Sequence, residues 1–175
     1  NYNPLIRQIR QMEKIVIAAV NGVAAGAGCN LALACDLRVA SEEAKFIQSF
    51  VRVGLAPDSG GSFILPRLVG VSKALEMLLL GDTIDAQEAL RIGLVARVFP
   101  AAEFGHAARE VAERIAAAPR GIGLIKRAVN HANLPSLESD LEYEAHLQEI
   151  AGRSSDYDEG VRAFLEKREP IFTGK

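Results

Sequence analysis

The sequence contains no tryptophan, only two cysteines, no uninterrupted hydrophobic run long enough for a membrane and no block of one charge sign. Its longest apolar stretches, residues 15–20 and 23–34, fall short of the roughly 20 apolar residues that span a bilayer, and we expect no signal peptide. Lysine and arginine are scattered among aspartate and glutamate with a formal net charge of −2. The sequence therefore contains no basic cluster of the kind that binds nucleic acid. We therefore expect a protein that binds neither membranes nor nucleic acid.

The two cysteines, Cys29 and Cys35, lie six residues apart, and no histidine stands at metal-ligand spacing from them. Such a pair is typical of buried thiols in a reducing compartment and not of a disulfide or a zinc site. We expect a cytoplasmic protein without a bound metal. What is present, 175 residues with 49% hydrophobic and 24% charged side chains, is enough for an ordinary globular core.

Hydrophobic periodicity predicts an α/β half followed by a helical half. A small-residue loop is expected over residues 23–28, and Asp85 with Glu88 forms a candidate capping box. The expected strands span residues 15–20, 37–40 and 45–50. The expected helices span residues 4–12, 27–35, 59–69, 72–80, 86–92, 103–118, 120–133, 136–154 and 156–167.

The glycine-rich segment "GVAAGAG", residues 22–28, leaves a strand and enters a helix. Helix-leading amides without intrahelical partners could donate to an anion or to a polarised carbonyl oxygen there. The segment lacks the lysine and the spacing of a phosphate-binding loop, which argues against a nucleoside triphosphate. Close packing of the helix on the strand explains the same small residues, so the pattern leaves both interpretations open.

Asp58 stands in "GLAPDSGG", between a proline and two glycines. As the residue before a predicted helix it could be an N-cap, and as a carboxylate half-buried among apolar neighbours it could be a general base. A serine could cap the helix but could not take up a proton. The three histidines and several cations are expected to be surface, interface or helix-end residues: His106, His131, His146, Arg52, Arg67, Lys73 and Lys126.

Four separated motifs together resemble the enoyl-CoA hydratase/isomerase, or crotonase, superfamily. They are "IVIAAVNGVAAGAGCNLALACDLRVASEEAKF", "VGLAPDSGGSFILPRLVG", "GDTIDAQEALRIGLV" and "EGVRAFLEKREPIFTG". The resemblance implies an α/β fold, a spiral of ββα turns over residues 1–100, and a helical trimerisation region over 101–175. It also implies an acyl-CoA thioester substrate with no separate cofactor, and a homotrimer or a dimer of trimers. The first third of the family's core has no counterpart here, so we expect a spiral truncated at its N-terminus.

The resemblance also implies roles for individual residues. The Ala27 amide matches one of two donors to the thioester oxygen, and Asp58 matches the acid of family isomerases. Asn30 and Phe50 replace the two glutamates with which family hydratases handle water. The remaining residues implied to bind the substrate or its CoA are Ala25, Gly26, Asn30, Phe50, Pro57, Gly61, Phe164 and Lys167. In the closing helix, Phe164 and Lys167 are expected on one face, at the CoA adenine and ribose phosphate.

Within the family, the sequence around Asp58 most resembles the ring-epoxide, oxepin-forming phenylacetyl-CoA isomerase branch. The resulting hypothesis is an acyl-CoA isomerase in which one aspartate moves a proton on a thioester-stabilised enolate. One alternative is an enoyl-CoA hydratase of fatty acid or phenylacetate breakdown, which would add water to 2-enoyl-CoA. Another is a non-catalytic subunit that binds acyl-CoA without turnover. The acyl group stays open among straight-chain, unsaturated and aromatic ones.

Overall fold

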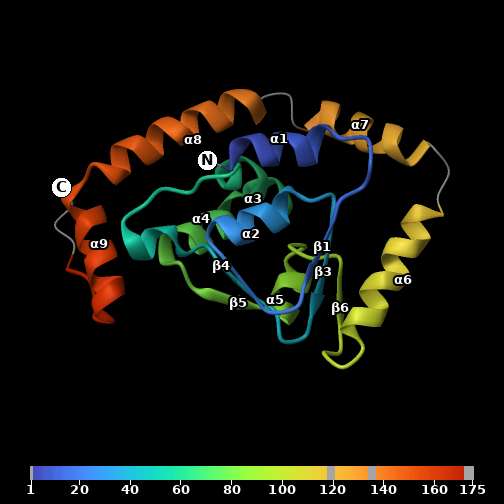
Figure 1. Ribbon diagram of the computed structural model, residues 1–175, viewed down its shortest axis with the longest axis horizontal. Coiled ribbons are helices and arrows are strands. Elements are labelled where there is room, and N and C mark those ends of the chain that lie inside the picture. Colours follow the sequence, from blue (N-terminus) through green and yellow to red (C-terminus); the bar gives the residue numbers. More distant parts are fainter. Residues whose placement is uncertain (1, 118–120, 134–136, 172–175) are drawn as a thin grey trace.

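The strands enter two three-stranded sheets in the computed structural model, which describes residues 2–117, 121–133 and 137–171 (Figure 1). One sheet has the order β1-β3-β6, with both pairings parallel, and contains β1 (Ile17–Val20), β3 (Leu37–Ser41) and β6 (Arg97–Phe99). The other has the order β2-β4-β5 and contains β2 (Val23–Ala25), β4 (Lys45–Ile47) and β5 (Thr83–Asp85). There β2 and β4 run parallel, while β5 is antiparallel to β4.

The first four strands alternate between the two sheets, and helices follow each pair of them. After β1 and β2 comes α2 (Ala27–Ala34); after β3 and β4 come η1 (Ser49–Val53), α3 (Gly61–Val69) and α4 (Val71–Leu80). The short helix α5 (Ala86–Arg91) then joins β5 to β6. This ββα succession confirms the expected α/β spiral.

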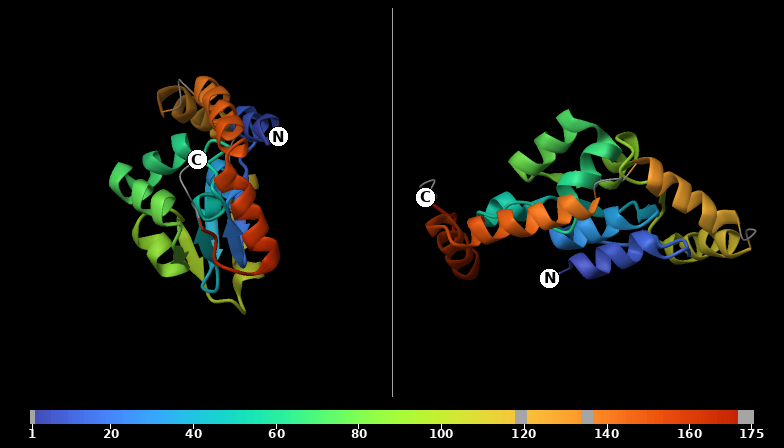
Figure 2. Two further views of the ribbon diagram at one scale, coloured as in Figure 1. Left: turned by 90° about the vertical axis from the view of Figure 1, so that its left-hand side faces the viewer. Right: turned by 90° about the horizontal axis from the view of Figure 1, so that it is seen from above.

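The remaining helices surround this spiral in Figures 1 and 2. They are α1 (Asn3–Gln11), α6 (Phe104–Ala116), α7 (Gly121–Asn133), α8 (Leu137–Gly152) and α9 (Ser155–Glu166). α1 lies beside α8, because the Asn3 side chain donates to the Leu141 carbonyl at 3.1 Å. α6 packs on β3, α8 on α3, and α9 on η1. The division at residue 100 stays a prediction, since these helices contact the spiral directly.

Three local expectations were wrong. Residues 23–25, expected as loop, form β2; the strand expected over 45–50 ends at Ile47, where the chain turns into η1; and β5 and β6 were not anticipated. Each missed strand is three residues long, so a pairing partner distant in sequence decides its conformation. Of the capping box only half forms: Asp85 accepts from the Glu88 amide at 2.8 Å, whereas the Glu88 carboxylate binds Arg91 and Lys73. The hydrogen bonds from Arg91 are the main cause that lowers the pKa of Glu88 to about 2.

α2 lies in the middle of the core and is buried along most of its length. Both cysteines are buried free thiols, as the sequence predicted, and burial raises the pKa of the Cys29 thiol to about 12. Leu33 of α2 and the surrounding Ile6, Phe46 and Leu65 are among the fully buried apolar side chains.

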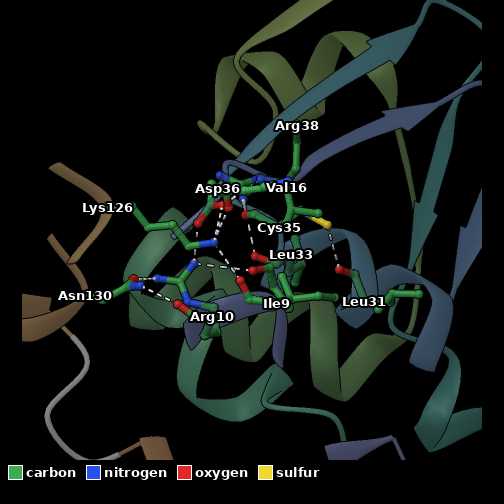
Figure 3. A network of polar contacts seen from close by, with 12 residues as sticks. Ile9, Arg10, Val16, Leu31, Leu33, Cys35, Asp36, Arg38, Lys126 and Asn130 are labelled. Atoms are coloured by element: carbon green, nitrogen blue, oxygen red, sulfur yellow. Dashed lines mark hydrogen bonds and ion pairs between the residues drawn. The ribbon is translucent and has the colours of Figure 1, made fainter. Parts of the chain in front are cut away.

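At the C-terminal end of α2 a buried network joins α1, β3 and α7 (Figure 3). The Lys126 ammonium lies 2.7 Å from the Asp36 carboxylate and donates to the Ile9 carbonyl at 2.7 Å. The same carboxylate accepts from the Val16 amide at 2.8 Å. Lys126 was predicted to be a solvated or helix-end charge, but its side chain is only 3% exposed. Its position in the core follows from Asp36, which gives the buried ammonium a counter-charge.

Candidate active site

The N-terminal end of α2 is set by an unusual backbone at Gly26. Its dihedral angles of φ +50° and ψ −122° are open to glycine but strained for a residue with a Cβ. The Gly26 amide donates to the Ile47 carbonyl at 2.9 Å, which fastens the turn to the end of β4. The first hydrogen bond of the helix runs from the Asn30 amide to the Gly26 carbonyl at 3.0 Å. The amides of residues 27–29 therefore precede it, at the positive end of the helix dipole, and Ala27 is partly exposed.

Phe50 forms an apolar wall against this turn. The short helix η1 brings its ring next to Gly26, where an added Cβ would meet the ring at 3.7 Å and the Ser49 hydroxyl at 3.0 Å. Phe50 as a whole is only 8% exposed. A carboxylate is thus absent from the second position at which family hydratases are expected to carry one.

The loop from η1 to α3 carries Asp58, whose carboxylate oxygen Oδ1 is buried and has no hydrogen-bond partner. The next residue, Ser59, has φ +55°, and its buried hydroxyl also lacks a partner. The N-cap of α3 is Gly60, with no side-chain capping bond, so the alternative that Asp58 caps this helix is wrong. Two successive residues in the left-handed region separate Asp58 from the helix. Unpaired buried polar atoms and a strained backbone reduce stability, and they are typical of functional sites.

A buried pair of amides connects the start of α2 to this loop. The Asn30 Nδ2 donates to the Asp58 carbonyl at 2.8 Å, and the Asn30 Oδ1 accepts from the Gln48 Nε2 at 2.9 Å. Both side chains have no exposed surface. Gly61 makes room for them, since a Cβ there would lie 2.7 Å from Asn30 Cγ. Sequence reasoning missed Gln48, and its one signal was a polar residue directly after the apolar end of β4.

The structure therefore brings together Gly26, Asn30, Phe50, the Asp58 backbone and Gly61. Of the other expected site residues on these segments, Ala25 is exposed at the end of β2, and Ala27 and Pro57 are half-buried.

Phe164 lies on α9 and Lys167 directly follows it, and α9 packs on η1 at one end of the molecule (Figure 1). Phe164 is 74% exposed. The expectation that both residues share one helix face was wrong: α9 ends at Glu166, and Lys167 is its C-cap, with φ +53°.

Among the expected surface residues, His106 and His146 are exposed; the side chain of His131 lies outside the described residues. Within the described ranges, no three histidine, cysteine or acidic side chains gather as a metal site would require. None of the described helices has the length and apolar character to cross a membrane. A cavity of about 310 Å³ opens at the other end of α2, lined by Arg10, Asp36, Arg38 and their neighbours, so it is separate from Asp58.

Comparison with known proteins gives one consistent result. The family described as "Enoyl-CoA hydratase/isomerase" matches residues 1–175. Two relatives are each 46% identical over 99% of this chain: a 1,2-epoxyphenylacetyl-CoA isomerase of Escherichia coli and a probable enoyl-CoA hydratase of Rhodobacter capsulatus. This chain spans 67% and 68% of their lengths. A solved enoyl-CoA hydratase from Mycobacterium avium subsp. paratuberculosis superposes with a TM-score of 0.95 at 40% identity, over 98% of this chain and 70% of that one.

Proposed function

This chain belongs to the enoyl-CoA hydratase/isomerase family, and from that premise we propose that it is an acyl-CoA isomerase whose single acid/base residue is Asp58. The observation that carries the proposal is the buried Oδ1 of Asp58, which has no protein partner. The family resemblance also implies that Asn30 and Phe50 stand where hydratases carry their two glutamates. A 1,3-proton shift needs one base that then becomes the acid, and it needs no activated water.

In the proposed reaction the thioester oxygen accepts a hydrogen bond from the Ala27 amide, at the positive end of the α2 dipole. The Asp58 carboxylate removes a proton from a carbon of the acyl chain, and the C–H electron pair moves into the thioester enolate. The protonated Asp58 then returns the proton to a different carbon, the enolate collapses, and the carboxylate is regenerated. A fixed amide donor contributes most while negative charge develops on the thioester oxygen, because its hydrogen bond is stronger to the enolate than to the ground-state carbonyl.

We assign the remaining residues to substrate binding and assembly. Ala25, Gly26, Phe50, Pro57 and Gly61 would face the acyl-CoA near the reacting carbons. On α9, the exposed Phe164 and Leu165 offer an apolar surface, 74% and 73% exposed, that suits a homotrimer or a dimer of trimers. Phe164 and Lys167 would then hold the CoA of a neighbouring subunit.

A hydratase is the second candidate, because one of the two 46% identical relatives is named a probable enoyl-CoA hydratase. Two incubations in ¹⁸O-labelled water separate the candidates, one with 3-enoyl-CoA and one with 2-enoyl-CoA. The isomerase converts 3-enoyl-CoA to 2-enoyl-CoA without taking up ¹⁸O, and Asp58→Asn stops the conversion. A labelled 3-hydroxyacyl-CoA as the main product would favour the hydratase. Binding of acyl-CoA without any product would leave the non-catalytic subunit.

A further inference from the structure

Asn30 joins the two parts of the proposed site that must keep a fixed distance. It stands in the first turn of α2, which begins with the Ala27 amide, and its Nδ2 donates to the carbonyl of Asp58 at 2.8 Å. The side chain has no exposed surface, so it reaches the loop only through the protein interior. Any shift of the loop against the helix must stretch or break this hydrogen bond.

Gln48 fixes which way the Asn30 amide faces. Its Nε2 donates to the Asn30 Oδ1 at 2.9 Å. If the Asn30 amide were flipped, its NH₂ group would face the NH₂ group of Gln48, and two donors would oppose each other. The orientation in which Asn30 Oδ1 accepts from Gln48 Nε2 is therefore the one that points the Asn30 donor at Asp58.

The peptide group after Asp58 is held from two sides. Its carbonyl accepts from the Asn30 side chain and, at 2.9 Å, from the Gly61 amide. Since a peptide group is planar, this carbonyl also fixes the orientation of the Ser59 N–H. Ser59 has φ +55°, a strained value for a residue with a side chain, and the two hydrogen bonds offset that strain. The Asp58 side chain thus leaves a backbone that cannot turn freely.

We propose that Asn30 is a positioning residue that fixes the Asp58 backbone relative to the Ala27 amide. This inference rests on the proposed isomerase function. Asn30 acts through Asp58, in place of the direct substrate contact that the sequence suggested. Proton transfer depends steeply on the distance between base and carbon, whereas binding of the CoA part does not. Loss of the Asn30 donor therefore lowers kcat and leaves KM nearly unchanged.

The test is Asn30→Leu, which keeps much of the volume and removes the donor without adding a charge. We expect kcat for isomerisation of 3-enoyl-CoA to fall about 10- to 100-fold, with KM within about twofold of wild type. Asn130→Leu is the matched control, because Asn130 also links two helices, α1 and α7, through hydrogen bonds with Arg10. It lies at the other end of α2, so it should lower the melting temperature and leave kcat of the folded protein unchanged.

The outcomes separate this inference from the proposed function. A folded Asn30→Leu with wild-type kcat overturns the inference, and so does a raised KM with unchanged kcat, which indicates direct substrate contact. If Asn30→Leu does not fold, Gln48→Met decides: it frees the Asn30 amide, and we expect kcat to fall about 3- to 10-fold. Wild-type kcat in Gln48→Met then overturns the inference, while an inactive Asp58→Asn leaves the proposed function standing. A wild type that converts no 3-enoyl-CoA defeats both.

Discussion

The two ends of α2 differ in how their polar groups are satisfied. At the C-terminal end, a carboxylate, an ammonium, two guanidinium groups and several backbone carbonyls form one network of hydrogen bonds and ion pairs (Figure 3). At the N-terminal end, the described residues include three buried oxygens without a partner, on Gln48, Asp58 and Ser59. The C-terminal end leaves one such atom, the Arg10 Nε. One end of the helix is anchored, and the other keeps polar groups available for a ligand.

Polar groups that stabilise the fold thus lie at one end of an 8-residue helix, and polar groups assigned to the reaction lie at the other. Arg10 of α1 and Arg38 of β3 bind the carbonyls that end α2, and Lys126 of α7 joins this network through Asp36. Burial lowers the pKa of Arg10 and Arg38, but both guanidinium groups stay protonated near neutral pH. At the N-terminal end of α2, the helix-leading amides and the Asp58 carboxylate contribute little to the free energy of unfolding. We infer that substitutions at the two ends have opposite signatures, and the predictions below test this in order of decreasing effect.

Asp58→Asn should have the largest effect, and on the reaction alone. We expect kcat to fall about 10²- to 10⁴-fold, because the amide cannot accept the proton. The free energy of unfolding should change by less than about 1 kcal/mol, since the Oδ1 that is replaced has no hydrogen bond to lose. Steady-state kinetics and urea unfolding of the same preparation measure both. If Asp58→Asn is strongly destabilised but keeps its kcat, Asp58 serves stability and not the reaction, and the comparison of the two ends fails.

Asp36→Asn is the matched substitution at the other end. It leaves the Lys126 ammonium, 3% exposed, without its close counter-charge, so we expect the free energy of unfolding to fall by about 3–5 kcal/mol. The kcat of the molecules that remain folded should equal that of wild type. Adding Lys126→Met to this variant should recover part of the loss, because the buried charge is then removed as well. A double variant that loses the sum of both single effects would argue against direct coupling.

Gly160→Ala tests the support that η1, and with it Phe50, receives from α9. An added Cβ would lie 2.8–2.9 Å from the Val53 backbone, so α9 must shift, and we expect a loss of about 1–3 kcal/mol in the free energy of unfolding. Gly105→Ala in α6 is the control: a Cβ there meets nothing within 4 Å, and the change should stabilise by about 0.4–1 kcal/mol. Equal effects of both substitutions would contradict a close contact between α9 and η1.

The smallest predicted effect concerns the Cys29 thiol, which lies in the first turn of α2. Burial raises its pKa from 9.0 to about 12, so above pH 9 the unfolded chain loses a proton that the folded chain keeps. Stability must therefore fall as pH rises through this window, by about 1 kcal/mol at pH 10. The difference between wild type and Cys29→Ala, measured by urea unfolding at pH 8 and pH 10, isolates this contribution. A difference independent of pH would mean that the folded thiol ionises as readily as the unfolded one.

Long periodic segments were predictable from the sequence, and contacts between distant residues were not. α1, α4 and the start of α2 at Ala27 follow from local pattern, and the confirmed family resemblance supplied the spiral of ββα turns. β2 and the burial of Lys126 depend on partners at Lys45–Ile47 and Asp36, which no local window contains. At the site, the sequence around Asp58 indicated a carboxylate that could act as a general base. Its unpartnered Oδ1, the strain at Ser59 and the amide pair behind it arise only when α2, β4 and the loop meet.

The contact between Gly61 and Asn30 constrains the evolutionary routes open to this protein. A glutamate at position 30, which the family resemblance implies for hydratases, would add a methylene against Gly61 and place a charge beside the Asp58 carbonyl, with Gln48 as its donor among the described contacts of this side chain. Such a change would fail as a single step, because the loop and Gln48 would have to adapt first. Positions 30, 48 and 61 should therefore be inherited as a group, and lineages that exchange one residue of the group should exchange the others. A change from isomerase to hydratase activity along this route would begin with functionally neutral substitutions at Gln48 and in the loop. Position 30 itself would change only afterwards.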